Sequence, residues 1–179
     1  MDTTKFLLNK IFKYRNLPDG VHYETNVTAI VNILLEICDI RASRGYIIKD
    51  ESIMISVRRD VAQEAERKKA DKIVLKDVSR PMRNLVVDDE KPLLVIECKS
   101  HSDPEQEFTD LNDDQIQTYM SSLKFPYGLL ISEYKAQFYS GKYGRYSTNI
   151  GPDLYISDIL DNINALIDKI KEACEVEDA

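Results

Sequence analysis

Residues 92–101, PLLVIECKSH, place a carboxylate and an ammonium group side by side at the end of an apolar run. The unbroken run 93–96 is typical of a strand buried on both faces of a sheet. Successive strand side chains alternate between faces, so Glu97 and Lys99 point the same way with Cβ atoms roughly 7 Å apart. Removing both charges from water costs free energy, so a buried pair of this kind usually has a partner or a function. One use is a metal-binding acid beside a lysine that contacts a water; a salt bridge where the strand reaches the surface is the alternative.

A second carboxylate, Asp71, opens another predicted strand, DKIVL, and the chain between it and Glu97 has room for two strands and a turn. If the two strands are neighbours, both carboxylates converge on one hard cation, which prefers oxygen ligands. Mg²⁺ or Mn²⁺ held there would polarise a phosphate oxygen and lower the pKa of a bound water. Lys99 would orient that water or balance charge on the phosphorus. We therefore expect the three side chains to meet within about one coordination shell; if Asp71 is only a turn acid, Asp88 or Asp89 is the next choice.

Composition limits the classes of protein that fit. The chain of 179 residues is predicted to form a single domain, 1–179, with 43% hydrophobic and 31% charged residues. A net charge of −7 argues against holding nucleic acid by bulk electrostatics, but it leaves open a nuclease whose acidic site is neutralised by metal ions. No membrane span or signal peptide is indicated. Three isolated cysteines predict neither zinc nor a disulfide framework, and the expected location is the cytoplasm.

The hydrophobic periodicity predicts a mixed α/β fold with a central sheet and helices on its faces. Helices are predicted at residues 3–14, 23–40, 115–123 and 156–173. Strands are predicted at residues 45–48 and 53–57 as a hairpin, then at 71–75, 92–99, 127–132 and 134–139, with a short piece at 85–87. Residues 58–70 are predicted as a short exposed helix or a loop. The core of the domain is expected to span about 20–140, with a closing helix at about 155–174.

The motifs KADKIVL and PLLVIECKS, followed by QIQTY, resemble the PD-(D/E)xK nuclease superfamily. More narrowly, the chain looks like the nuclease domain at the N-terminus of type I restriction enzyme R subunits and their free-standing relatives, and the resemblance covers about residues 20–140. It implies a restriction-endonuclease-like fold, in which a mixed β-sheet is flanked by helices on both faces. In these domains one strand carries the aspartate, the next carries acid-x-lysine, and a helix carries glutamine-x-x-x-tyrosine. Gln115 and Tyr119, four residues apart, would share one face of that helix.

By this resemblance the chain is a Mg²⁺-dependent endonuclease of the restriction type that hydrolyses phosphodiester bonds in DNA. Asp71 and Glu97 would bind the metal, Lys99 would be catalytic, and Gln115 would position the phosphate or the water. The family's upstream helical glutamate corresponds by position to Glu24, a further catalytic and metal-binding candidate. Helicase or specificity subunits, or a second copy of the chain, are the partners implied besides DNA. The proline that often precedes the aspartate is absent, since alanine stands there.

Several candidates have alternative interpretations. Glu24 would also compensate the dipole of its helix, and Glu36 is a rival on the same predicted helix. Gln117 is the rival of Gln115, and Tyr119 is expected either in the core or in contact with nucleic acid. The whole domain could also be a catalytically silent module that keeps the nuclease fold to bind nucleic acid or a partner, and an RNA substrate is a weaker option.

Basic residues precede the predicted aspartate strand and are the best candidates for phosphate contacts, although a hydrated surface is the simpler interpretation. They are Arg58, Arg59, Arg67, Lys68 and Lys69. His22 and His101 are expected to be solvated loop residues, and His101 lies close enough to Lys99 in the chain to touch substrate.

Overall fold

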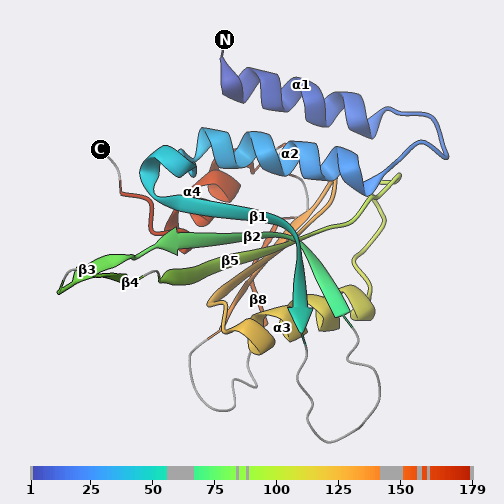
Figure 1. Cartoon of the computed structure of the whole chain (residues 1–179). Coiled ribbons are helices and arrows are strands. Elements are labelled where there is room, and N and C mark those ends of the chain that lie inside the picture. Colours follow the sequence, from blue (N-terminus) through green and yellow to red (C-terminus); the bar gives the residue numbers. More distant parts are fainter. Residues whose placement is uncertain are drawn as a thin grey trace, which may run out of the picture.

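A six-stranded mixed sheet forms the centre of the protein in a computed structural model (Figure 1). The strand order is β1-β2-β5-β6-β7-β8; β5 and β6 run parallel, and all other neighbours are antiparallel. The strands are β1 (Tyr46–Ile55), β2 (Arg67–Asp77), β5 (Glu90–Cys98), β6 (Tyr127–Ile131), β7 (Ala136–Ser140) and β8 (Gly151–Ile156). The structure describes residues 2–55, 67–83, 85–87, 89–141, 151–156, 159–160 and 162–177.

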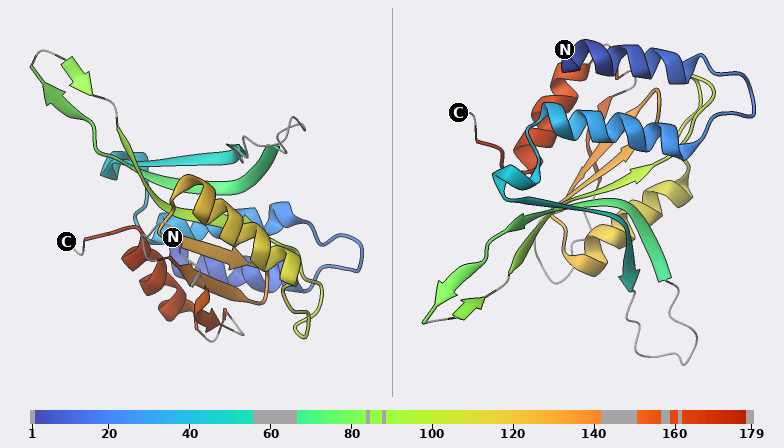
Figure 2. Two further views of the ribbon diagram at one scale, coloured as in Figure 1. Left: turned by 90° about the horizontal axis from the view of Figure 1, so that it is seen from below. Right: turned by 45° about the horizontal axis from the view of Figure 1, so that its top comes forward.

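Helices cover both faces of this sheet (Figures 1 and 2). They are α1 (Thr3–Arg15), α2 (Glu24–Ile37), α3 (Asp110–Leu123) and α4 (Ile163–Ala173), with a 3₁₀ turn η1 (Ala42–Arg44) before β1. Side chains of α1, α2 and α4 form one core cluster with one face of the sheet, and α3 forms a second cluster with the opposite face. The architecture therefore has three layers, and α3 is the helix that covers the second face among the described residues.

Strand β5 lies in the middle of these layers and is buried on both faces, as its unbroken apolar run predicts. Leu94 and Ile96 belong to the cluster of α1, α2 and α4, whereas Val95 belongs to the cluster of α3. This alternation follows from the two-residue period of a strand. From Leu94 onward the odd-numbered positions of β5 thus face α3, which sets the direction of the polar residues at its end; Leu93, beside the register shift, belongs instead to the first cluster.

Helix α3 connects the parallel strands β5 and β6 and begins earlier than predicted. Its start at Asp110 is fixed by a capping box in which Thr109 and Asn112 each bond the other's backbone N–H at 3.1 Å. The helix packs closely on β6 because Gly128 has no side chain: an added Cβ would lie 2.7 Å from the Sδ of Met120. The polar stretch before residue 115 had hidden this first turn of the helix.

Three other boundaries differ from the prediction. Residues 46–55 form one strand and not a hairpin, because the polar residues at its centre pair with β2: Lys49 with Ile73 and Asp50 with Lys72. Strand β2 begins at Arg67, four residues before the predicted start. Strand β8 was not predicted, and helix α4 begins at Ile163. In each case the partner strand or the neighbouring layer decides the structure, and local composition does not.

Strands β3 (Arg80–Met82) and β4 (Leu85–Val87) form a separate two-stranded hairpin, and the short piece predicted at 85–87 is present. Figure 2 shows this hairpin projecting away from the body of the protein, beyond the ends of β2 and β5. None of the helices in the described ranges combines the length and the apolar character that crossing a bilayer requires.

Candidate functional site

The two predicted carboxylates lie side by side on adjacent strands, at the point where the pairing of β2 with β5 ends. Strand β2 pairs antiparallel with β5, and the pair Lys72–Ile96 is followed directly by Asp71 and Glu97. The backbone N–H of Asp71 donates to Glu97 Oε1 at 3.0 Å, and the N–H of Cys98 donates to Asp71 Oδ2 at 2.7 Å. Each carboxylate therefore accepts a hydrogen bond from the strand that carries the other, which fixes both side chains at this point of the sheet.

Lys99 follows the last residue of β5 and stays in line with it, because its N–H donates to the carbonyl of Ile131 in β6 at 2.9 Å. Its Nζ lies 3.6 Å from Glu97 Oε2 and 4.0 Å from Glu24 Oε1. The ammonium group is thus placed between a buried carboxylate of the sheet and a half-exposed one at the start of α2. The structure brings Asp71, Glu97 and Lys99 together, and Glu24 reaches the same site through Lys99.

Glu97 is only 2% exposed. Burial raises the pKa of its carboxyl group to about 8, and the nearby charge of Asp71 contributes to the rise. The N–H of Asp71 and the charge of Lys99 act in the opposite direction and do not compensate. With a pKa of about 8 the carboxyl group is mostly protonated at pH 7. The positive charge of Lys99 is therefore not sufficient to keep Glu97 ionised at this pH.

The donor set fits a magnesium-type cation better than a closed metal cage. No three Asp, Glu, His or Cys side chains among the described residues gather closely enough to hold a metal ion. Mg²⁺, however, is usually held by one or two carboxylates and keeps several waters. Asp71 and Glu97 supply two such carboxylates, which lie side by side on β2 and β5. The expected role of Glu24 as a third ligand is not supported, because its carboxylate faces Lys99 and does not complete a three-ligand group.

Gln115 and Tyr119 link α3 to the start of β2. The side-chain amide of Gln115 donates to the Tyr119 hydroxyl at 2.9 Å, and that hydroxyl donates to the carbonyl of Lys69 at 2.9 Å. The charges of Glu97 and Asp71 contribute to raising the pKa of Tyr119, after the larger effect of burial, so the hydroxyl lies on the acidic side of the site. Gln115 is therefore the glutamine on the site side.

The rival Gln117 bonds Asp113 at 2.7 Å instead. Tyr119 is 1% exposed, so the predicted direct contact with nucleic acid is corrected: its ring is core, and its hydroxyl holds the backbone two residues before Asp71.

A cavity of about 380 Å³ lies beside these residues, between α3 and the start of β2. It is lined by Lys69, Leu111, Asp114, Gln115, Thr118 and Tyr119. Of the predicted basic residues, Lys69 lines this cavity, and it is exposed to solvent. Arg58 and Arg59 lie outside the described residues, and of Lys68 only the backbone, in β2, is described.

The prediction that both histidines are solvated is wrong. His101 is 3% exposed, with its ring centroid 4.9 Å from that of Phe108, and the side chain of His22 is 7% exposed. Both lie near Glu133, a fully buried carboxylate that sequence reasoning missed. A glutamate in the turn of a predicted hairpin is normally exposed, so the sequence carries no signal for its burial.

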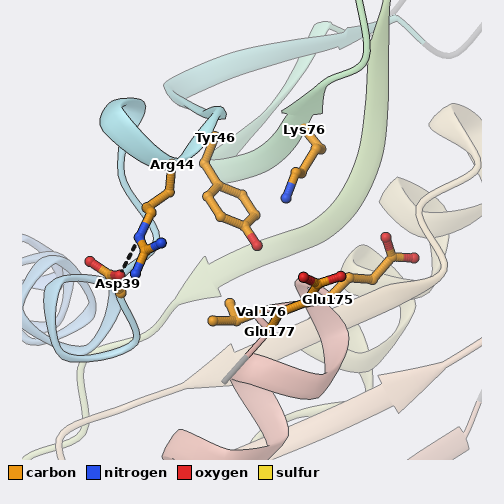
Figure 3. A pocket seen from close by; sticks show the side chains of 7 residues that line it. All are labelled: Asp39, Arg44, Tyr46, Lys76, Glu175, Val176 and Glu177. Carbon is orange, nitrogen blue, oxygen red and sulfur yellow. Dashed lines mark hydrogen bonds and ion pairs between the residues drawn. The ribbon is translucent and has the colours of Figure 1, made fainter. Parts of the chain in front are cut away.

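A second cavity, of about 190 Å³, lies toward the other end of β2 (Figure 3). Its charged side chains are largely paired: Arg44 contacts Asp39 at 2.6 Å, and Lys91 contacts Glu175 at 2.7 Å. The Tyr46 hydroxyl donates to the carbonyl of Cys174 at 2.8 Å. These contacts tie the end of α4 to β1, so we interpret this region as structural.

Comparison with known proteins supports the fold alone. No protein-family model and no curated protein matches the chain. One solved structure, described as a cryo-EM structure of a DrdV–DNA complex, is similar with a TM-score of 0.55 and 14% sequence identity over 98% of both chains. The predicted restriction-endonuclease-like α/β fold, a mixed central sheet with helices on both faces, is thereby confirmed.

Proposed function

We propose that the chain is a divalent-metal-dependent endonuclease that hydrolyses phosphodiester bonds in DNA, with a restriction or defence role. The observation that carries the proposal is the meeting of Asp71, Glu97 and Lys99 where the pairing of β2 with β5 ends. The similar solved structure is of a DNA complex, which supports DNA as the substrate class. The fold confirmed above is compatible with this chemistry but does not define it.

Each residue of the site would have a separate role in the hydrolysis. In the reaction a water oxygen bonds to phosphorus as the water gives up a proton to solvent, and the bond from phosphorus to one ester oxygen breaks as that oxygen takes up a proton. A bound Mg²⁺ or Mn²⁺, held by Asp71 and Glu97, would supply Lewis acidity and a more acidic water. Lys99, in its ammonium form, would donate to a phosphate oxygen and offset the negative charge that develops there. The amide of Gln115, which donates to the Tyr119 hydroxyl, would orient the phosphate or the water.

The net negative charge of the chain limits how tightly it can bind DNA. With a net charge of −7, nonspecific binding through phosphate contacts is weak unless the site carries its cation. Lys69, exposed beside the cavity at α3, is the described basic residue best placed to contact a phosphate next to the scissile one. Helicase or specificity subunits, or a second copy, would supply further contacts, and these partners remain predictions.

One observation favours a second candidate, a catalytically silent module that binds nucleic acid or a partner. One oxygen of each carboxylate already accepts a backbone N–H, which leaves fewer lone pairs for a cation. In this alternative the paired acids would only join β2 to β5, and Lys99 would only neutralise them.

The test is cleavage of supercoiled plasmid, linear duplex DNA, single-stranded DNA and RNA, each with Mg²⁺, Mn²⁺ or a chelator. The wild type is compared with Lys99→Ala and with Lys91→Ala, a matched control whose ion pair with Glu175 is remote from the site. Metal-dependent cutting that is lost only in Lys99→Ala supports the nuclease, and the substrate panel identifies the polymer. Cutting that survives in Lys99→Ala contradicts the assigned site. Binding without cutting by any variant favours the silent module.

A further inference from the structure

Glu133, in the turn between β6 and β7, has a carboxylate that is completely buried. Its Oε1 accepts the backbone N–H of His101 at 2.8 Å, and its Oε2 accepts the hydroxyl of Ser100 at 2.7 Å. Ser100 and His101 directly follow Lys99 in the chain. Both oxygens of Glu133 therefore hold the segment that carries the lysine of the site.

The same carboxylate also reaches the segment that precedes α2. His22 Nδ1 lies 3.6 Å from Glu133 Oε2, and the other ring nitrogen of His22 bonds the carbonyl of Leu17 at 2.9 Å. His22 is two residues before Glu24, whose carboxylate faces Lys99. One buried group thus lies between the two segments that bring Lys99 and Glu24 together.

The turn that carries Glu133 is itself firmly held. Ser132 and Lys135 close it with a backbone hydrogen bond of 2.8 Å. Arg15, at the end of α1, donates from Nε to the carbonyl of Glu133 at 2.7 Å, and its guanidinium lies 4.6 Å from the ring centroid of Tyr134. The backbone of Glu133 is consequently held in place by contacts with α1 and with the sheet.

A tight turn between two strands needs no buried carboxylate, and burying one costs free energy that an apolar residue would not cost. We infer that Glu133 is a positioning residue, which sets Lys99 and Glu24 at the correct distance from each other without touching the reacting atoms. The inference rests on the proposed function, since it assigns Glu133 to the support of that same site. Small displacements of a catalytic group lower the rate far more than they weaken binding.

The experiment combines steady-state cleavage of duplex DNA with amide hydrogen exchange on four variants. Glu133→Ala removes both acceptors, Glu133→Gln keeps an acceptor for the His101 N–H, and Ser100→Ala removes a single bond. Glu105→Ala, on the exposed part of the same connection, is the matched control. We expect Glu133→Ala to lower kcat by about 100-fold with KM within about twofold, and Glu133→Gln to recover part of that loss. Ser100→Ala, the mildest of the three site variants, should lower kcat by a few-fold.

Exchange should become faster in Glu133→Ala at residues 99–101 and at residues 24–26 together, while the rest of the sheet stays protected. Unchanged kcat, equal losses in Glu105→Ala, or faster exchange across the whole sheet would overturn the inference. If the wild type cuts no substrate, the proposed function fails, and the exchange data alone test whether Glu133 supports both segments. Loosening confined to both segments then still supports Glu133 as their common support, and loosening of one segment or neither overturns it.

Discussion

Glu97 Oε2 and Lys99 Nζ lie 3.6 Å apart, yet the lysine does not keep the glutamate ionised. Glu97 is buried beside Asp71, and these two effects raise the pKa of Glu97 to about 8. Lys99, with 20% of its side chain exposed, lies 4.0 Å from a second carboxylate, that of Glu24. Because burial is the largest cause of the raised pKa of Glu97, the charge of Lys99 at this distance does not offset it.

Removing the charge of Glu97 should stabilise the metal-free protein at high pH. The carboxyl has a pKa of about 8 when folded and an ordinary value of 4.5, so between these values the folded state binds more protons and stability falls as pH rises. Glu97→Gln keeps the acceptor for the Asp71 N–H and removes the titration. In chelator, its free energy of unfolding should exceed that of the wild type by a few kcal/mol at pH 9, because each pKa unit corresponds to about 1.4 kcal/mol.

Urea unfolding at pH 5, 7 and 9 measures this difference, with Glu105→Gln as an exposed control. The advantage of Glu97→Gln should be smallest at pH 5 and grow toward pH 9. Parallel pH profiles for the wild type and Glu97→Gln would refute the raised pKa.

Binding of Mg²⁺ should release a proton near neutral pH. Glu97 is mostly protonated at pH 7 without metal, and a bound cation requires the carboxylate form. Affinity for Mg²⁺ should therefore rise with pH up to about 8 and then level off. Calorimetric titrations in two buffers of different ionisation enthalpy measure the released proton. Asp71→Asn should bind Mg²⁺ much more weakly, and a titration in which this variant binds as well as the wild type would exclude Asp71 as a ligand.

The two glutamines of α3 provide a matched pair of substitutions. Gln115 bonds Tyr119 on the site side, whereas Gln117 bonds Asp113. We expect Gln115→Ala to lower the cleavage rate by roughly 10-fold or more, since one positioned donor is lost, and Gln117→Ala to leave it unchanged. Cleavage rates of both variants at saturating DNA test this, and equal effects would remove Gln115 from the site.

The sequence was sufficient to predict those parts of the fold and the site that depend on patterns of neighbouring residues. The doubly buried strand β5, the strand–acid–x–lysine order and the helices α1 and α2 follow from periodicity and from adjacent residue types. The sequence could not place Glu133 in the interior, because its burial depends on α1 and on two loops distant in the chain. It also misjudged β1, whose polar centre is held by pairing with β2 and not by its own residues. Long-range contacts decided each of these cases.

The hydroxyl of Tyr119 should matter for both stability and activity. In Tyr119→Phe the Lys69 carbonyl loses its part-buried hydrogen-bond partner, which costs about 0.5–1.5 kcal/mol, and Gln115 loses the acceptor that orients it. Tyr46→Phe is the matched control, because it removes a similar bond to the Cys174 carbonyl far from the site. Both variants should lower the free energy of unfolding by similar amounts, and only Tyr119→Phe should reduce kcat.

Urea unfolding and cleavage kinetics, measured on the same preparations, separate the two effects of Tyr119→Phe. Equal kcat for Tyr119→Phe and Tyr46→Phe would mean that Tyr119 serves the core alone. A selective fall in kcat would instead connect α3 to the carboxylates through the backbone of β2, where Lys69 is followed two residues later by Asp71.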